Sequence, residues 1–187
     1  MQTKKAFFRE VLKNFKTAGT IMPSSKFLIK KMLKSIDFKT ARVIVEYGPG
    51  NGIITQEILR RMHSDAVLIC FEINTQFYQY VKKIDDNRLI VLNSSAENIK
   101  EELEKLNISY ADYFISSLPL TMIPKIITEN ILKKSKELLS SNGQFIQYQY
   151  SLRFYNKIKQ VFGKNNVILK FEFANIPPAF IYKCIKK

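Results

Sequence analysis

Residues that build disulfides and metal sites are scarce in this chain. The 187 residues include two cysteines and one histidine, His63. Cys70 and Cys184 each lie within an apolar run, so we expect both thiols to be buried and reduced. A zinc site needs several Cys or His side chains close together. The sequence therefore predicts no metal centre.

Long apolar runs, linkers and internal repeats are missing as well. No run approaches the ~20 residues needed to cross a bilayer, and nothing resembles the apolar core and cleavage site of a secretory signal. We therefore expect a cytoplasmic protein, associated peripherally with the membrane. The length suits a single domain over 1–187, with a helical extension over 1–40 and a core over 41–187.

Acidic residues are few and unevenly placed. The net charge is +14. Residues 1–42 carry eleven Lys and Arg against two acids, a net +9; residues 43–150 carry eleven against thirteen, a net −2; residues 151–187 carry eight against one, a net +7. Basic ends favour an anionic partner, either a nucleic acid or an anionic membrane surface, with plain solubility as the alternative.

Two helices are predicted before the core. Apolar side chains recur at spacings of three and four over Lys4–Lys16, with lysines between them, which predicts a basic amphipathic helix. Its apolar face could insert into an anionic membrane or pack on the protein. Ser24 or Ser25 can cap a second helix. The apolar stripe of that helix is Leu28, Ile29, Met32, Leu33 and Ile36.

From residue 41 onward, predicted strands alternate with predicted helices. The strands are 41–47, 66–72, 88–92, 112–116, 143–150, 167–173 and 180–185; the helices are 53–62, 75–83, 96–106, 124–139 and 152–162. This order predicts parallel crossovers, while the last two strands are joined tightly enough to be antiparallel. We expect an α/β fold: a Rossmann-like, seven-stranded, mostly parallel sheet with an antiparallel last strand and helices on both faces.

The most informative motif is the loop Glu46–Gly52 (EYGPGNG), between the first strand and the next helix. Gly48, Gly50 and Gly52 permit a sharp turn and a close approach of backbone to ligand. Their GxGxG spacing differs from the GxGxxG that seats a dinucleotide pyrophosphate, and Glu46 would repel that anion. S-adenosylmethionine (SAM) carries an ammonium and a sulfonium, so the loop predicts a SAM site.

Residues at the ends of the next two strands extend this predicted site. Glu72 ends the second strand, where a carboxylate can accept hydrogen bonds from both ribose hydroxyls, and Ile73 follows it. After the third strand, Asn93 or the backbone of Ser95 and Ala96 could read an adenine edge; an ordinary turn is the alternative.

The segment Ser116-Ser117-Leu118-Pro119-Leu120 follows the fourth strand. With the glycine loop and Glu72, it resembles SAM methyltransferases of the rRNA adenine dimethylase type, which share the seven-stranded arrangement. The chain more closely resembles bacterial phospholipid N-methyltransferases, which make phosphatidylcholine from phosphatidylethanolamine. The stretches 19–25 (GTIMPSS), 117–120 (SLPL) and 175–179 (NIPPA) carry that resemblance.

The fourth-strand segment separates the two resemblances. Adenine methylases have Asn/Asp-Pro-Pro-Tyr or Asn-Leu-Pro-Tyr there, and the last ring stacks on a flipped base. Ser117, Leu118 and Pro119 precede a leucine instead, which suits a small aliphatic amine held by Ser117 and main-chain carbonyls, with Ser116 near the cofactor. Three strand tyrosines could accept hydrogen bonds from the amine, or could simply be core aromatics. They are Tyr47, Tyr148 and Tyr150.

Three hypotheses remain open. The first is a phospholipid headgroup N-methyltransferase that docks on an anionic membrane through the basic first helix. The second is a methyltransferase acting on the adenine N6 of rRNA or another nucleic acid. The third is a non-catalytic SAM-fold module that binds membrane or RNA. The first two use SAM as cofactor, with in-line attack of a neutral amine on its methyl group. We expect a monomer.

Overall fold

The computed structural model describes residues 25–187. The predicted helix over Lys4–Lys16 and the stretch 19–24 lie outside the described residues, so those predictions remain predictions. Ser25 caps α2 (Lys26–Leu33) by accepting the N–H of Leu28 at 3.2 Å, as predicted. All five residues of the predicted apolar stripe of this helix are buried.

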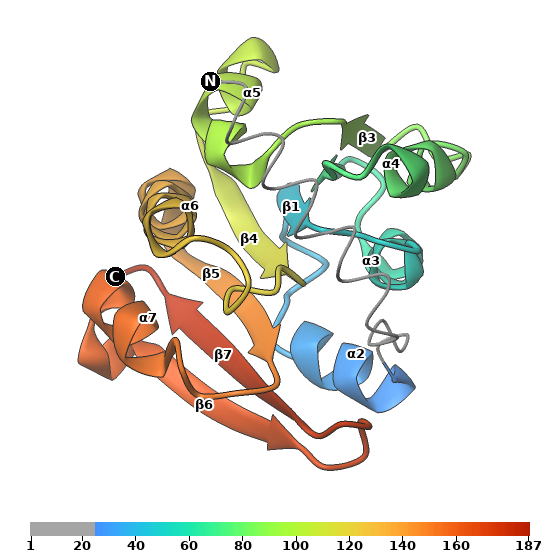
Figure 1. Ribbon diagram of the computed structural model, residues 1–187. Coiled ribbons are helices and arrows are strands. Elements are labelled where there is room, and N and C mark those ends of the chain that lie inside the picture. The colour runs from blue at the N-terminus through green and yellow to red at the C-terminus, as the bar shows by residue number, and fades with distance from the viewer. Residues whose placement is uncertain (1–24) are drawn as a thin grey trace.

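Seven strands form one sheet in the order β3-β2-β1-β4-β5-β7-β6 (Figure 1). Their bounds are β1 Val43–Tyr47, β2 Val67–Phe71, β3 Leu89–Leu92, β4 Ala111–Ser116, β5 Leu139–Gln149, β6 Val167–Glu172 and β7 Ala179–Ile185. The first five strands pair in parallel, and β7 runs antiparallel to both β5 and β6. The predicted α/β fold is confirmed. The fifth strand begins earlier than predicted, because Leu139 already pairs with Ala111 ahead of an irregularity in β4.

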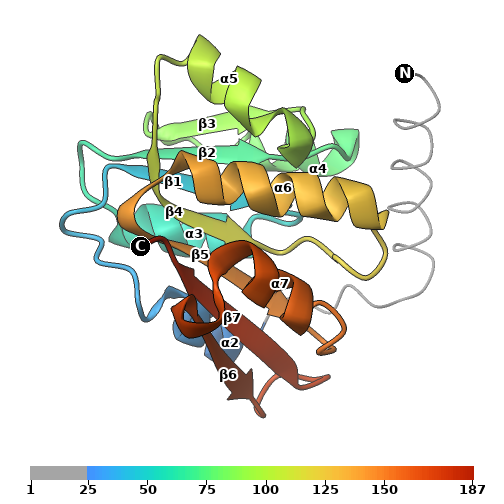
Figure 2. The same ribbon diagram turned by 90° about the vertical axis from the view of Figure 1, so that its left-hand side faces the viewer.

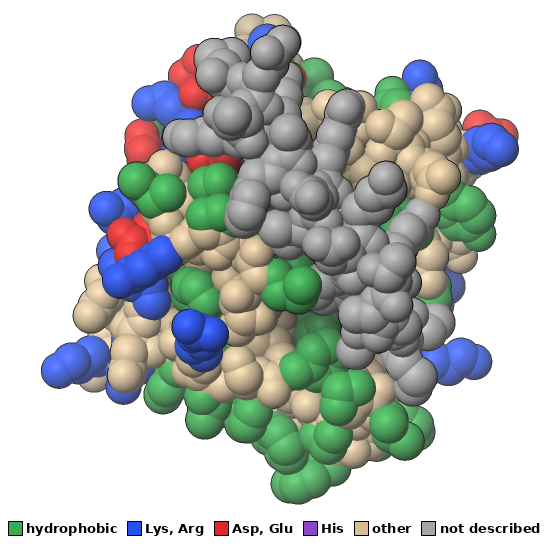
Figure 3. Space-filling view, in the orientation of Figure 1, with side chains coloured by type: hydrophobic (Ala, Val, Ile, Leu, Met, Phe, Trp, Pro, Cys, Tyr) green, Lys and Arg blue, Asp and Glu red, His purple; other side chains and the backbone are tan. Residues whose placement is uncertain are grey.

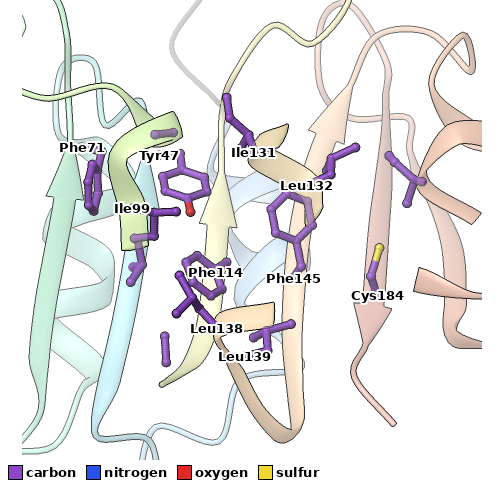
Figure 4. Close-up of a cluster of buried hydrophobic side chains, with 14 of the residues drawn as sticks. Tyr47, Phe71, Ile99, Phe114, Ile131, Leu132, Leu138, Leu139, Phe145 and Cys184 are labelled. Carbon is purple, nitrogen blue, oxygen red and sulfur yellow. The ribbon is translucent and has the colours of Figure 1, made fainter. Parts of the chain in front are cut away.

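Helices cover both faces of the sheet (Figure 2). One face carries α5 (Ile99–Lys105), α6 (Lys125–Leu138) and α7 (Tyr155–Phe162), and the other carries α2 and α3 (Ile53–Arg61). The remaining elements within residues 25–187 are α4 (Thr75–Val81) and the short 3-10 helices η1 (Ala96–Asn98) and η2 (Lys164–Asn166). Each face has its own buried apolar cluster, and Figure 4 shows the one beneath α6. Within residues 25–187, no helix is both long enough and apolar enough to span a membrane.

The loops that follow β1, β2, β4 and β5 emerge at one edge of the sheet, because these strands are parallel. Two successive antiparallel pairings turn β6 back to the direction of β5, so the β6–β7 connection opens at the same edge. Ligand sites of open α/β sheets form at the carboxyl ends of the strands. We call this side the catalytic edge.

Candidate active site

The glycine loop after β1 is a tight turn that only glycine fills easily. Gly48, Gly50 and Gly52 have φ angles of 68°, 56° and 75°, in the left-handed region that other residues avoid. A Cβ on Gly48 would lie 3.3 Å from the side chain of Leu118, whereas a Cβ on Gly50 would meet no atom of the described residues within 4 Å. The loop is therefore packed at Gly48 and open at Gly50.

Glu72, the residue after β2, contacts this loop. Its Oε2 accepts the N–H of Gly50 at 3.2 Å and its Oε1 accepts the N–H of Asn74 at 2.8 Å. The side chain is 5% exposed, and burial raises the pKa of its carboxyl group. A carboxylate offers about four acceptor sites, so the oxygens retain capacity for a ribose hydroxyl. Glu72 thus faces the open side of the glycine loop.

Glu46 lies beneath the loop, on the face covered by α3, and is fully buried. Its Oε2 accepts hydrogen bonds from the Thr55 hydroxyl at 2.7 Å and the Cys70 thiol at 3.4 Å. Its Oε1 has no hydrogen-bond partner among residues 25–187. Burial raises the pKa of Glu46 to about 7. A buried carboxylate with an unused oxygen favours a cationic ligand.

Thr55 and Cys70 were not predicted to touch the site, although Cys70 and Cys184 are buried free thiols, as expected. The sequence could have indicated that Thr55 contacts the site, because this residue lies in the first helical turn after the glycine loop.

The residues predicted to read adenine lie beside Glu72, but their side chains already have partners. The Nδ2 of Asn93 donates to the backbone carbonyl of Glu72 at 2.8 Å. The Ser95 hydroxyl accepts the N–H of Glu97 and so caps η1. Ala96 is buried, and Ile73 is half-buried. These residues form the part of the catalytic edge that lies next to Glu72.

The segment after β4 lies against the glycine loop. The N–H of Ser117 donates to the carbonyl of Tyr47 at 3.0 Å, and the Ser116 hydroxyl accepts the N–H of Leu118 at 3.3 Å. The Ser117 Oγ is buried and has no partner among the described residues. Leu120 is fully buried, so its side chain offers no surface to a ligand.

Two glutamines on β5, which were not predicted, hold this segment in place. The Nε2 atoms of Gln147 and Gln149 donate to the carbonyl of Leu118 at 3.1 and 2.7 Å. Both side chains are buried. Because a carbonyl oxygen has two lone pairs, these bonds occupy the Leu118 carbonyl, while the Ser117 hydroxyl has no partner among the described residues. The sequence could have indicated this role, because the two glutamines occupy alternate positions of a buried strand.

The structure corrects the proposed role of Tyr47. Its side chain is fully buried in the cluster beneath α6 (Figure 4). Glu46 lies on the opposite face, where it bonds to Thr55 of α3. The Tyr47 hydroxyl is 3.0 Å from the Ser135 hydroxyl, and burial raises the pKa of Tyr47 well above the usual value. Adjacent residues of a strand point to opposite faces, so Tyr47 cannot share the pocket of Glu46.

The residues present fit a SAM-like cofactor. The loop is open at Gly50, Glu72 faces that opening, and Glu46 keeps an unused buried oxygen. Within residues 25–187, no group of three or more His, Cys, Asp or Glu could hold a metal ion.

Comparisons with known proteins match this arrangement. A family model, "Methyltransferase small domain", matches residues 14–173. An ornithine lipid N-methyltransferase of Singulisphaera acidiphila is 30% identical over 180 residues, 95% of this chain and 93% of that protein. A ribosomal RNA small subunit methyltransferase A of Mycoplasma mycoides is 28% identical over 150 residues, 78% of this chain but 53% of that protein. The crystal structure of an O-methyltransferase from Bacillus cereus in complex with SAH covers 97% of this chain and 91% of its own, with a TM-score of 0.69 and 14% identity.

Proposed function

Since this chain belongs to the methyltransferase small domain family and is a SAM-dependent methyltransferase, we propose that it N-methylates the amine of a membrane lipid headgroup. The observation that carries the proposal is the segment after β4, where Ser117 offers a buried, unpartnered hydroxyl and Leu120 offers no ring. A small aliphatic amine needs one acceptor and no stacking surface. The family assignment leaves the non-catalytic hypothesis without support.

Headgroups of the phosphatidylethanolamine type are the first candidate acceptors, on the resemblance carried by 117–120 and 175–179. Ornithine lipids are the second, because a relative of nearly the same length carries that activity in its name. Both present an aliphatic amine to the same hydroxyl.

The reaction transfers a methyl group from sulfur to nitrogen. When bound, SAM supplies an electrophilic methyl on a sulfonium. Glu46 and Glu72 would hold the cofactor through its cationic and ribose groups. Ser117 would accept a hydrogen bond from the neutral amine and so direct the lone pair of the amine nitrogen toward the methyl carbon. Gln147 and Gln149 fix the Leu118 carbonyl and with it the position of Ser117. Positioning of this kind supplies most of the acceleration.

Methylation of rRNA is less well supported. The rRNA relative matches over about half of its own length, and the position where adenine methylases place a stacking ring is a buried leucine. The basic ends of the chain suit RNA and anionic lipid equally.

One experiment decides between these acceptors. The purified protein is incubated with methyl-labelled SAM and separately with ribosomal RNA, with phosphatidylglycerol vesicles containing phosphatidylethanolamine, or with such vesicles containing ornithine lipid. Vesicles of phosphatidylglycerol and phosphatidylcholine are the control, because neither lipid has a free amine. We expect label in an amine-bearing lipid. Label in RNA alone would overturn the proposal.

A further inference from the structure

Large apolar side chains are exposed mainly along one part of the catalytic edge. Six of the ten exposed large hydrophobic residues within 25–187 follow the ends of β4, β5 or β6. They are Met122, Ile126, Tyr150, Leu152, Phe173 and Ile176. In Figure 3, hydrophobic side chains gather over the lower part of this face, where Figure 1 places β6, its connection to β7, and α2.

The β6–β7 connection is the most exposed part of this surface. Phe173 and Ile176 are 77% and 73% exposed, and Phe27 at the start of α2 is 62% exposed. Exposed phenylalanine and isoleucine at a turn are costly in water, because each leaves apolar area unburied. We refer to Phe27, Phe173 and Ile176 as the apolar tip.

Polar contacts hold the apolar tip together. Asn175 is 2% exposed; its Oδ1 accepts the N–H of Ser25 at 3.1 Å, and its Nδ2 donates to the carbonyl of Pro177 at 2.7 Å. Lys31 of α2 pairs with Glu172 at the end of β6, at 3.2 Å. The turn is therefore fixed to the start of α2, and its apolar side chains are held outward.

Exposed cations lie on elements next to the tip: Lys26 and Lys30 flank Phe27 along α2, and Arg153 follows the end of β5 at the same edge. Lys26, Lys30 and Arg153 are exposed, and none of them forms an ion pair with a carboxylate in the described part of the chain. The nearby acid Glu172 is neutralised by Lys31. Exposed apolar side chains together with exposed cations match an anionic bilayer surface, where the apolar groups enter the boundary of headgroups and acyl chains. The sugar-phosphate backbone of RNA would use the cations but not the apolar side chains.

We propose that the apolar tip is a membrane-docking surface, which inserts into an anionic bilayer and turns the catalytic edge toward the lipid. Because β6 ends at the same edge as β4, insertion of the tip presents the Ser117 segment to the headgroup layer. This inference rests on the proposed function and adds a surface distinct from the predicted helix over Lys4–Lys16.

The first test uses the absence of tryptophan from the sequence. Phe173→Trp places a single fluorophore on the tip, and Tyr110→Trp places one at a 60% exposed aromatic position ahead of β4, at the opposite edge. With vesicles of phosphatidylglycerol and phosphatidylethanolamine, we expect the emission of Phe173→Trp to shift to the blue and that of Tyr110→Trp to stay unchanged. Equal spectra for Phe173→Trp with and without vesicles would overturn the inference.

The second test separates docking from catalysis. We expect Phe27→Ser with Phe173→Ser to weaken vesicle binding about 10- to 100-fold, while activity on a short-chain, monomeric lipid amine stays unchanged. Tyr110→Ser is the matched control. Vesicle binding that equals wild type would overturn the docking surface. A wild-type protein that binds vesicles through the tip but methylates no lipid would instead overturn the proposed function.

Discussion

Replacing Glu46 with glutamine should change how the stability of this protein depends on pH. Burial raises the pKa of Glu46 from 4.5 to about 7. The difference between these two values corresponds to ~3 kcal/mol. Since the side chain is fully buried, little solvent screening reduces this figure.

The sign follows from proton binding. Between the two pKa values the folded protein keeps a proton on Glu46 that the unfolded chain releases, so a rise in pH favours unfolding. The stabilisation is fully present below pH 4.5 and is lost as the pH rises to about 7. Measured without SAM, the free energy of unfolding of Glu46→Gln relative to wild type should therefore increase by ~3 kcal/mol between pH 4.5 and 7.5.

Binding of the cationic cofactor should depend on pH in the opposite sense. SAM favours the ionised carboxylate, so the wild-type Kd should tighten about 20-fold between pH 5.5 and 7.5, as Glu46 loses its proton. Glu46→Gln should bind weakly at both values. Urea unfolding and calorimetry with SAM measure the two effects. The reasoning would be refuted if the difference in unfolding free energy between variant and wild type were the same at pH 5 and 7.5. It would also be refuted if the wild-type Kd for SAM did not change with pH.

Three further substitutions test the site. Ser117→Ala should lower kcat/KM for the lipid amine about tenfold by removing one hydrogen bond, with SAM affinity unchanged in calorimetry; an equal loss in Thr121→Ala would contradict a specific role. Gly50→Ala should fold at a cost of ~1–2 kcal/mol for its left-handed φ, but its melting temperature should no longer rise when SAM is added. An undiminished rise would mean that the cofactor does not occupy the space beside Gly50. Tyr47→Phe should lower the free energy of unfolding by ~1 kcal/mol, because the hydrogen bond to Ser135 is lost, and should leave kcat unchanged. A large fall in kcat would show that Tyr47 takes part in the reaction.

The sequence determined the order of elements because the hydrophobic periods of strands and helices are local. The apolar stripe of α2, the β-branched runs of the central strands and the tight link between β6 and β7 each predicted an element that the structure contains. The glycine loop could be located the same way. Gly48, Gly50 and Gly52 are required by the left-handed backbone conformation of one short segment, and three closely spaced glycines are visible in the sequence itself.

Contacts between distant segments decided the rest. Alternation along β1 put Glu46 and Tyr47 on opposite faces, but which face carries the pocket depends on where α3 and α6 pack. The pairing of Leu118 with Gln147 and Gln149 joins residues about thirty positions apart, and Asn175 reaches back 150 positions to Ser25. Such pairings depend on the register of the sheet and the packing of side chains, which only the folded chain fixes.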